Sequence, residues 1–132
     1  MFYVLLWHAV KLTNGHFVVS HGNGYSDVEG VCIVDTDGKL IKSFGGKRGS
    51  GIEQMYCPIH LSVDGNGFVL VADQLQNQVL LLDSNLKFQR EFMWEGRHEL
   101  KGPSRILLDD SCDLLLVGES FGSRSILIFQ LG

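Results

Sequence analysis

The sequence predicts an all-β fold, a partial β-propeller of about three four-stranded antiparallel blades in which the last blade is incomplete. A block of short apolar runs recurs along the 132 residues, with Phe17 and Phe68 spaced 51 apart and Pro58 and Pro103 spaced 45 apart. Asp-Gly and Asn-Gly turn residues separate the runs, and no stretch has a convincing 3.6-residue period. A repeat of this length with several strands per copy is typical of small sheets stacked face to face around an axis.

Each repeat is expected to form its strands between the turn signals. The expected strands are 5–12, 16–21, 30–35 and 39–44 in the first repeat; 58–63, 67–72, 78–83 and 87–93 in the second; and 104–108, 113–117 and 124–130 in the third. The blades then occupy about 1–44, 58–93 and 103–130 of a single domain, 1–132.

The apolar runs show how these sheets are covered. The runs at 79–82, 114–117 and 126–129 are nearly continuous in apolar residues, whereas a half-exposed strand would alternate. Continuous runs indicate sheets covered on both faces, and without helices the cover must be other sheets. The runs at 39–44 and 87–92 mix charged with apolar residues, as expected of outer edge strands.

Composition excludes several classes of protein. The formal charge of −4 and the pI of about 5.6 argue against broad phosphate binding, which needs an excess of Lys and Arg. Cys32, Cys57 and Cys112 lack zinc-site spacing, and their odd number favours reduced thiols and a cytoplasmic location. No apolar run approaches the ~20 residues of a membrane-spanning helix, and we interpret 1–6 as strand rather than as a signal peptide.

The second repeat contains a characteristic pattern in 58–73 followed by 77–83, and the Ser-Phe-Gly-Gly link at 43–46 precedes it. Together these motifs resemble an NHL repeat. The resemblance implies a propeller, most often six-bladed, like the C-terminal NHL domain of tripartite-motif proteins, which recognises substrates for a ubiquitin ligase carried elsewhere in the chain. Some members bind RNA, and a related group is a metal-dependent lyase. This chain departs from the family at Gln76 and Gln78, where Asn and Arg are usual.

Three blades cannot close a ring, because propellers have four to eight. Either the chain is part of a longer protein or two copies pair into a six-bladed ring. Residues 1–6 meet the first inner strand with no crossover segment, so we expect the first arrangement.

No constellation in the sequence predicts catalysis, a cofactor or a metal site. The five histidines fall at non-equivalent positions of the repeat, and His8 and His60, offset by one place, are expected to face opposite ways. No Gly-x-Ser-x-Gly elbow is present. The Gly-rich segment 45–51 lacks the ending of a phosphate-binding loop, and we interpret it as a flexible crossover between blades.

One end of the propeller is predicted to bind a partner, because the crossovers and the second-to-third strand loops emerge there with aromatic and cationic side chains. The candidate residues are Tyr25, Lys47, Arg48, Tyr56, Trp94, Arg97, Lys101, Phe121 and Arg124. Acidic residues, including Glu29, Asp73 and Glu119, are interleaved with them, and mixed charge favours a protein or peptide ligand.

The sequence therefore predicts a non-catalytic protein-interaction module. Two alternatives remain. Single-stranded RNA could bind through Lys47, Arg48, Arg97 and Lys101, with Tyr56 or Trp94 stacking on bases. A lyase- or hydrolase-like propeller would carry a metal in its channel.

Overall fold

The computed structural model describes residues 5–22, 29–45, 55–92, 100–122 and 124–130. It confirms the predicted fold class: the chain is all-β, with three antiparallel sheets arranged as in a propeller. The first sheet contains β1 (Leu5–Lys11), β2 (Phe17–Gly22), β3 (Gly30–Val34) and β4 (Leu40–Gly45); the second contains β5 (Pro58–Val63), β6 (Val69–Asp73), β7 (Gln78–Leu82) and β8 (Phe88–Phe92); and the third contains β9 (Pro103–Asp109), β10 (Leu114–Glu119) and β11 (Ile126–Gln130).

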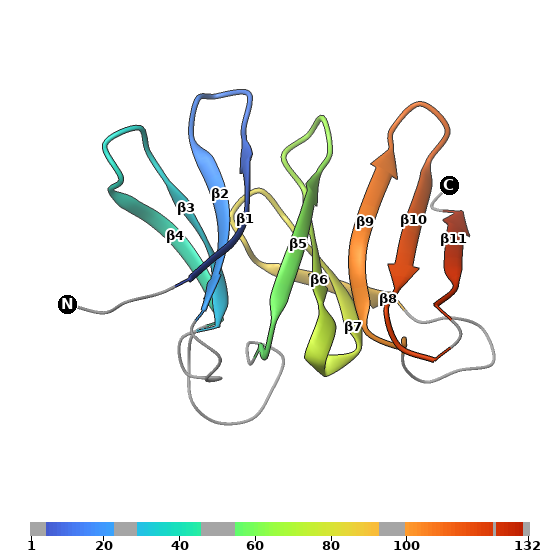
Figure 1. Cartoon of the computed structure of the whole chain (residues 1–132). Coiled ribbons are helices and arrows are strands. Elements are labelled where there is room, and N and C mark those ends of the chain that lie inside the picture. Colours follow the sequence, from blue (N-terminus) through green and yellow to red (C-terminus); the bar gives the residue numbers. More distant parts are fainter. Residues whose placement is uncertain (1–4, 23–28, 46–54, 93–99, 123, 131–132) are drawn as a thin grey trace.

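In each sheet the strands are neighbours in chain order. The inner strands β1, β5 and β9 run alongside one another, so the sheets stand face to face (Figure 1). The turns between β1 and β2, between β5 and β6 and between β9 and β10 lie at one end of the molecule, and the turns that follow β6 and β10 lie at the other end, which we call the crossover end (Figure 1). The strand bounds differ from the predicted ones by no more than two residues.

Turn chemistry fixes the hairpins. In the β5–β6 turn, the Asp64 carboxylate accepts the backbone N–H groups of Asn66 and Phe68, both at 2.8 Å. Gly67 then adopts a φ of 86°, which glycine reaches without steric cost. Asp35 and Asp83 accept the corresponding N–H groups in their own turns. The same local solution therefore sets the length and register of successive hairpins.

The middle sheet is covered on both faces. All five residues of β6 are buried, and alternate side chains point to opposite sides. One cluster, between the first and second sheets, includes Val18, Val31 and Val71. A second cluster, between the second and third sheets, includes Leu70 and Leu115. The continuous apolar runs are thus explained by sheets packed on sheets.

The far face of the third sheet has no cover among the described residues. Leu107 pairs in register with Leu116, and Leu116 pairs with Ile128. Leu107, Ile126 and Ile128 are exposed, Ile126 at 73%. An apolar row of this kind is what an open stack of blades leaves at its end.

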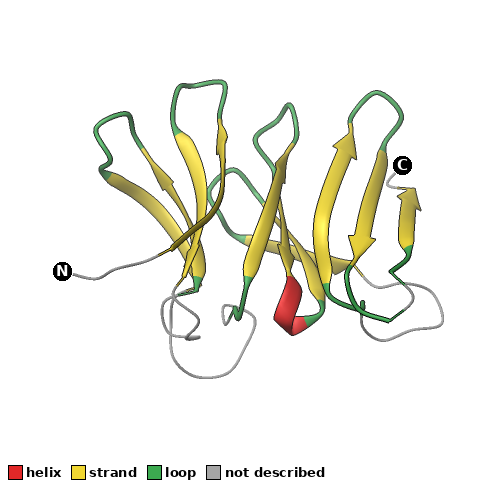
Figure 2. Ribbon diagram, viewed as in Figure 1, coloured by secondary structure: helices red, strands yellow, loops and turns green. Residues whose placement is uncertain are grey.

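One short helix was not predicted. Gln74–Gln76 form a turn of 3₁₀-helix, η1, between β6 and β7, and Asn77 ends it with a φ of 55° (Figure 2). It covers no sheet face. In the described part of the chain, no helix is long and apolar enough to cross a membrane.

The packing predicts how core truncation should behave. Leu80 of β7 is fully buried between sheets, so Leu80→Ala should lower the free energy of unfolding by about 2–5 kcal/mol. Leu40→Ala, on the exposed outer strand β4, should change it by less than about 0.5 kcal/mol. Urea denaturation followed by tryptophan fluorescence measures both. Equal losses for the two variants would contradict the described packing.

Candidate functional site

Each inner strand places one polar side chain at the same position of the repeat: His8 in β1, His60 in β5 and Arg105 in β9. In all three strands the residue just before it is skipped in the pairing with the neighbouring strand. Such β-bulges re-aim side chains and are common beside functional sites. We call His8, His60 and Arg105 the inner-strand ladder.

The two histidines satisfy backbone groups across the blade boundaries. The N–H of Leu61 donates to His8 Nδ1 at 3.0 Å, and the N–H of Ile106 donates to His60 Nδ1 at 3.1 Å. Inner strands are sheet edges whose outward N–H groups have no strand partner. Each histidine therefore supplies the acceptor that the next blade lacks. The two rings also stack, with centroids 4.2 Å apart and an interplanar angle of 14°.

These bonds determine which nitrogen carries the proton. A ring nitrogen that accepts a hydrogen bond is unprotonated, so a neutral imidazole must hold its proton on Nε2. Burial, followed by the neighbouring His8 and Arg105, lowers the pKa of His60 to about 4. Burial and then Arg105 also lower the pKa of His8. Both rings are therefore neutral near pH 7, with an Nε2–H available to donate.

A shallow depression of about 280 Å³ opens at this point. It is lined by Trp7, His8, Ile59, His60 and Arg105. Among the described residues neither Nε2 atom has a hydrogen-bond partner, and neither is a buried unpaired atom. Both Nε2–H groups thus reach solvent beside the exposed Arg105.

This arrangement overturns one prediction from the sequence. His8 and His60 were expected to occupy non-equivalent positions and to face opposite ways, and they are in fact equivalent and stacked. The prediction aligned Phe17 with Phe68, 51 residues apart. In the structure the equivalent turn glycines are Gly15 and Gly67, 52 residues apart, each donating its N–H to the carbonyl three residues earlier. The one-residue difference moves His8 onto the face of His60.

A buried carboxylate anchors the crossover into the second blade. Asp73, fully buried at the end of β6, accepts the backbone N–H of Cys57 at 2.6 Å and that of Tyr56 at 3.2 Å. Gln78 Nε2 also donates to it, at 3.2 Å. Burial raises the pKa of Asp73, and the hydrogen bonds from Cys57, Gln78 and Tyr56 oppose that rise. Gln78, one of the departures from the NHL pattern, therefore takes part in this anchor.

The other two sheets place acids in comparable positions. Glu119 of β10 accepts the N–H of Lys101 at 2.6 Å. In the first sheet, Glu29 accepts from Trp7 Nε1 at 2.9 Å. A Cβ added to Gly22 would lie 1.5 Å from Glu29 Oε2, so the Glu29 carboxylate fills the space that a side chain at position 22 would occupy.

These acids correct a second expectation. Glu29, Asp73 and Glu119 were predicted to be interleaved with the cations on a binding surface, but all three are buried. Their acceptors face backbone and indole N–H groups inside the molecule. They support the loops instead of presenting charge to a partner.

Four of the predicted binding residues lie within the described chain, all at the crossover end. Tyr56, Lys101, Phe121 and Arg124 are exposed. The N–H of Phe121 donates to the carbonyl of Lys101 at 3.1 Å, and the Phe121 ring lies where a Cβ on Gly102 would fall, 2.5 Å away. The other predicted residues, Tyr25, Lys47, Arg48, Trp94 and Arg97, lie outside the described residues.

Sequence reasoning missed two residues of this end. Leu75, in η1, is 60% exposed. Asn77 Oδ1 accepts the N–H of Gly102 at 2.9 Å, and the Asn77 carbonyl accepts that of Leu100 at 3.1 Å. The available signal in the sequence was an Asn directly before the predicted strand, because Asn tolerates the left-handed conformation that Asn77 adopts.

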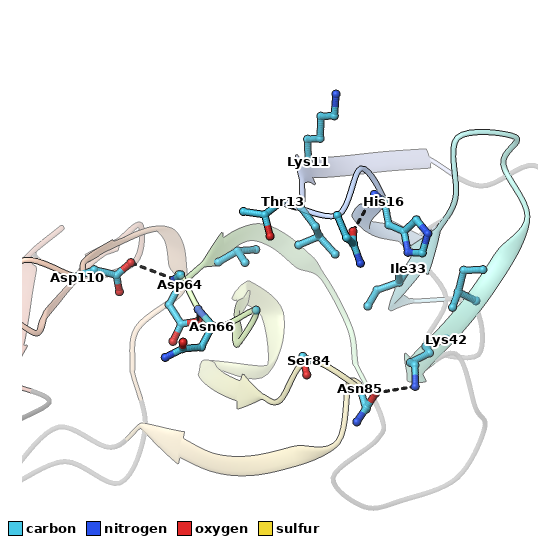
Figure 3. Close-up of a pocket in the computed structure, with 16 residues that line it drawn as sticks. Lys11, Thr13, His16, Ile33, Lys42, Asp64, Asn66, Ser84, Asn85 and Asp110 are labelled. Atoms are coloured by element: carbon cyan, nitrogen blue, oxygen red, sulfur yellow. Dashed lines mark hydrogen bonds between the residues drawn. The ribbon is translucent and has the colours of Figure 1, made fainter.

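The opposite end holds a larger cavity, of about 630 Å³, among the hairpin turns of neighbouring blades (Figure 3). Lys42 Nζ donates to Asn85 Oδ1 at 2.6 Å, and Asp110 accepts the N–H of Gly65 at 3.2 Å. The first bond links β4 to the β7–β8 turn, and the second links the β9–β10 turn to the β5–β6 turn. Lys42 and Asp110 therefore connect neighbouring blades at this end.

Comparisons with known proteins identify the fold. No family model matches the sequence, and no curated protein matches it significantly. Hydrazine synthase from Kuenenia stuttgartiensis is similar in structure, with a TM-score of 0.69 and 15% identity over 92% of this chain and 33% of that chain. A streptogramin B lyase structure has a TM-score of 0.58 and 14% identity over 98% of this chain and 45% of that chain.

A third structure, a catalytically inactive virginiamycin B lyase from Staphylococcus aureus with quinupristin, has a TM-score of 0.52 and 13% identity over 98% of this chain and 46% of that chain. At such identities the similarity shows a propeller-like fold alone. The chain spans less than half the length of these proteins.

The Asp73 anchor makes a stability prediction. Asp73→Ala leaves the N–H groups of Tyr56 and Cys57 without their acceptor and should cost about 2–3 kcal/mol of unfolding free energy. Asp37→Ala, at an exposed turn, should cost less than about 0.5 kcal/mol. Urea denaturation of the wild type and the two variants provides the comparison. A urea midpoint for Asp73→Ala equal to that of the wild type would refute the anchoring role.

The ladder makes a pH prediction. The folded-state pKa of His60, about 4, lies below its ordinary value of 6.5, so the unfolded chain binds the proton more readily. The stabilisation that the neutral His60 ring contributes is complete above pH 6.5 and is lost as the pH falls toward 4. Because the ring is partly exposed, we expect a loss of about 1 kcal/mol.

His60→Gln retains a hydrogen-bond acceptor but cannot titrate. Its unfolding free energy, measured by urea denaturation between those two pH values, should fall less steeply than that of the wild type. Identical slopes for H60Q and wild type would show that His60 does not contribute to the pH dependence.

Proposed function

We propose that this chain is a non-catalytic interaction module, part of a propeller that binds a protein or peptide ligand at its crossover end. The observation that carries the proposal is the group of exposed apolar side chains there: Tyr56 at 42%, Leu75 at 60% and Phe121 at 45%. We call these three residues, with Lys101 and Arg124, the crossover-loop face. Aromatic side chains at exposed positions are favoured anchors of protein interfaces.

The loops that carry this face are tied together by hydrogen bonds. The N–H of Gln74 donates to the Cys57 carbonyl at 2.9 Å, which joins η1 to the segment of Tyr56. Asn77 joins the other end of η1 to Gly102, and Ser120 donates to the Gly102 carbonyl at 2.8 Å. A preorganised surface loses less conformational entropy when it binds.

The charge of the described face favours a particular ligand. Lys101 and Arg124 are exposed beside Phe121, whereas the acids Asp73 and Glu119 are buried beneath the loops. A peptide that carries an apolar side chain flanked by carboxylates fits this pattern.

The resemblance to NHL repeats supports a more specific role, substrate recognition for a ubiquitin ligase carried elsewhere in a longer protein. Two copies pairing into a six-bladed ring would present the same face twice. In either arrangement the chain contributes binding and the chemistry belongs to another part.

Single-stranded RNA is the second candidate ligand. Lys101 and Arg124 would contact phosphates, and the exposed Phe121 ring offers a stacking surface. The overall charge of −4 makes this less favourable. The lyase- or hydrolase-like alternative requires a metal. A metal at the ladder would need an unprotonated Nε2, but the hydrogen bonds accepted by Nδ1 of His8 and His60 keep the proton on Nε2.

Selection of a displayed peptide library on the immobilised chain tests the proposal. We expect enrichment of peptides with an aromatic or aliphatic residue next to Asp or Glu. In a fluorescence-polarisation assay, Phe121→Ala and Leu75→Ala should each lower the affinity for the enriched peptides roughly tenfold. Leu40→Ala, an equally exposed leucine on β4, should leave affinity unchanged.

Two outcomes would reject the proposal. One is that no peptide is enriched over a blank surface. The other is that Phe121→Ala, Leu75→Ala and the control Leu40→Ala lower the peptide affinity equally. Titration with labelled oligouridine at low and high salt examines RNA in parallel. Binding at low salt that Lys101→Ala and Arg124→Ala weaken would favour RNA as the ligand.

A further inference from the structure

The inner-strand ladder combines hydrogen-bond donors without an accompanying acceptor. His8 and His60 each accept a backbone N–H on Nδ1, at 3.0 and 3.1 Å, which leaves Nε2–H as the polar group that each ring presents to solvent. Arg105 donates from Nη1 to the Ser104 carbonyl at 2.8 Å. Its other guanidinium N–H groups have no protein partner among the described residues.

Among the described residues, no acidic side chain lines the depression at the ladder. The depression is lined by the three ladder residues together with Trp7 and Ile59, none of them acidic. Glu29, which contacts the lining residue Trp7, is buried and accepts from Trp7 Nε1 at 2.9 Å. A cation would be repelled by Arg105 and would find no carboxylate ligand there.

We propose that the depression at His8, His60 and Arg105 binds an oxyanion, the carboxylate or phosphate group of a small ligand. Two neutral N–H donors beside a guanidinium in one depression provide the donors and the positive charge that such a group requires. A volume of about 280 Å³ accommodates the anionic group and a few further atoms, which would contact Trp7 and Ile59. This site is independent of the peptide-binding proposal.

The electrostatics around the rings agree with this assignment. At His60, β1 contributes His8 and β9 contributes Arg105, and both, after burial, lower the His60 pKa. A bound anion would offset the effect of Arg105. Anion binding should therefore make His60 easier to protonate and should shift the NMR signals of its ring.

The bulges are the second structural argument. A bulge precedes the ladder residue in all three inner strands, although the residues at the bulge differ: Trp7, Ile59 and Ser104. A bulge that persists while its residue type varies indicates that the fold uses it to aim the following side chain. In each case that side chain is a histidine or an arginine.

NMR of ¹⁵N-histidine-labelled protein tests the proposal with inorganic phosphate and acetate as probes, and with sodium chloride at matched ionic strength as the control. Before any probe is added, His8 and His60 should show unprotonated Nδ1 and protonated Nε2. Phosphate or acetate should then shift their Nε2 and Hε1 signals along a saturating curve, while His16, at the far end among the turns, stays unshifted. The tighter probe identifies which oxyanion the site prefers.

Arg105→Gln and Arg90→Gln form a matched pair, because each removes one exposed arginine charge. Arg90 lies on the outer strand β8 over the Phe92 ring. R105Q should weaken the saturable binding roughly tenfold, and R90Q should leave it unchanged. The backbone spectrum confirms that both variants are folded.

The proposal fails if the histidine signals respond to phosphate and acetate only as they do to chloride. Equal weakening by R105Q and R90Q would likewise overturn it, because a general charge effect would then explain the response. Protonated Nδ1 in His8 and His60 would remove its structural basis.

Discussion

The architecture depends on apolar sheet faces being covered by neighbouring sheets. β6 shows this most clearly, because all five of its residues are buried while its strand partners lie only to its sides. No side chain from its own sheet can cover those faces, so the first and third sheets must. The clusters around Val71 and around Leu70 are the result, and they hold the inner strands close enough for polar side chains to reach across the blade boundaries.

That closeness raises a second problem, which the histidines solve. An inner strand is a sheet edge, and its outward N–H groups need acceptors. His8 and His60 provide them for Leu61 and Ile106, and the Ser62 hydroxyl accepts from Leu108 at 3.3 Å. The structural role fixes the tautomer, and the tautomer determines what the rings offer to a ligand. The backbone bond and the proposed oxyanion site thus use opposite sides of the same imidazole.

Much of the fold could be predicted from the sequence, because hairpin turns and apolar runs are local signals. Asp64 and Gly67 identify a turn without knowledge of the rest of the chain. The ladder could not be predicted, because its register depends on bulges and on the turn length, and a one-residue difference moves a side chain to the other face. Asp73 was misplaced for a related reason: an acid at a strand end resembles a surface residue until the N–H groups of a distant crossover, at Tyr56 and Cys57, are brought onto it.

The ladder also bears on what can cover the open face of the third sheet. That face presents Leu107, Leu116 and Ile128 in one row across three strands, so a sheet packed on it would have to be apolar on its facing side. At the equivalent edge, however, Arg105 stands where His8 and His60 stand, and a guanidinium cannot accept a backbone N–H. A blade packed there would need a different acceptor for its inner-strand N–H, or would turn a carbonyl toward the guanidinium. The inner edge of β9 therefore differs chemically from the inner edges of β1 and β5, which carry an imidazole acceptor at this position.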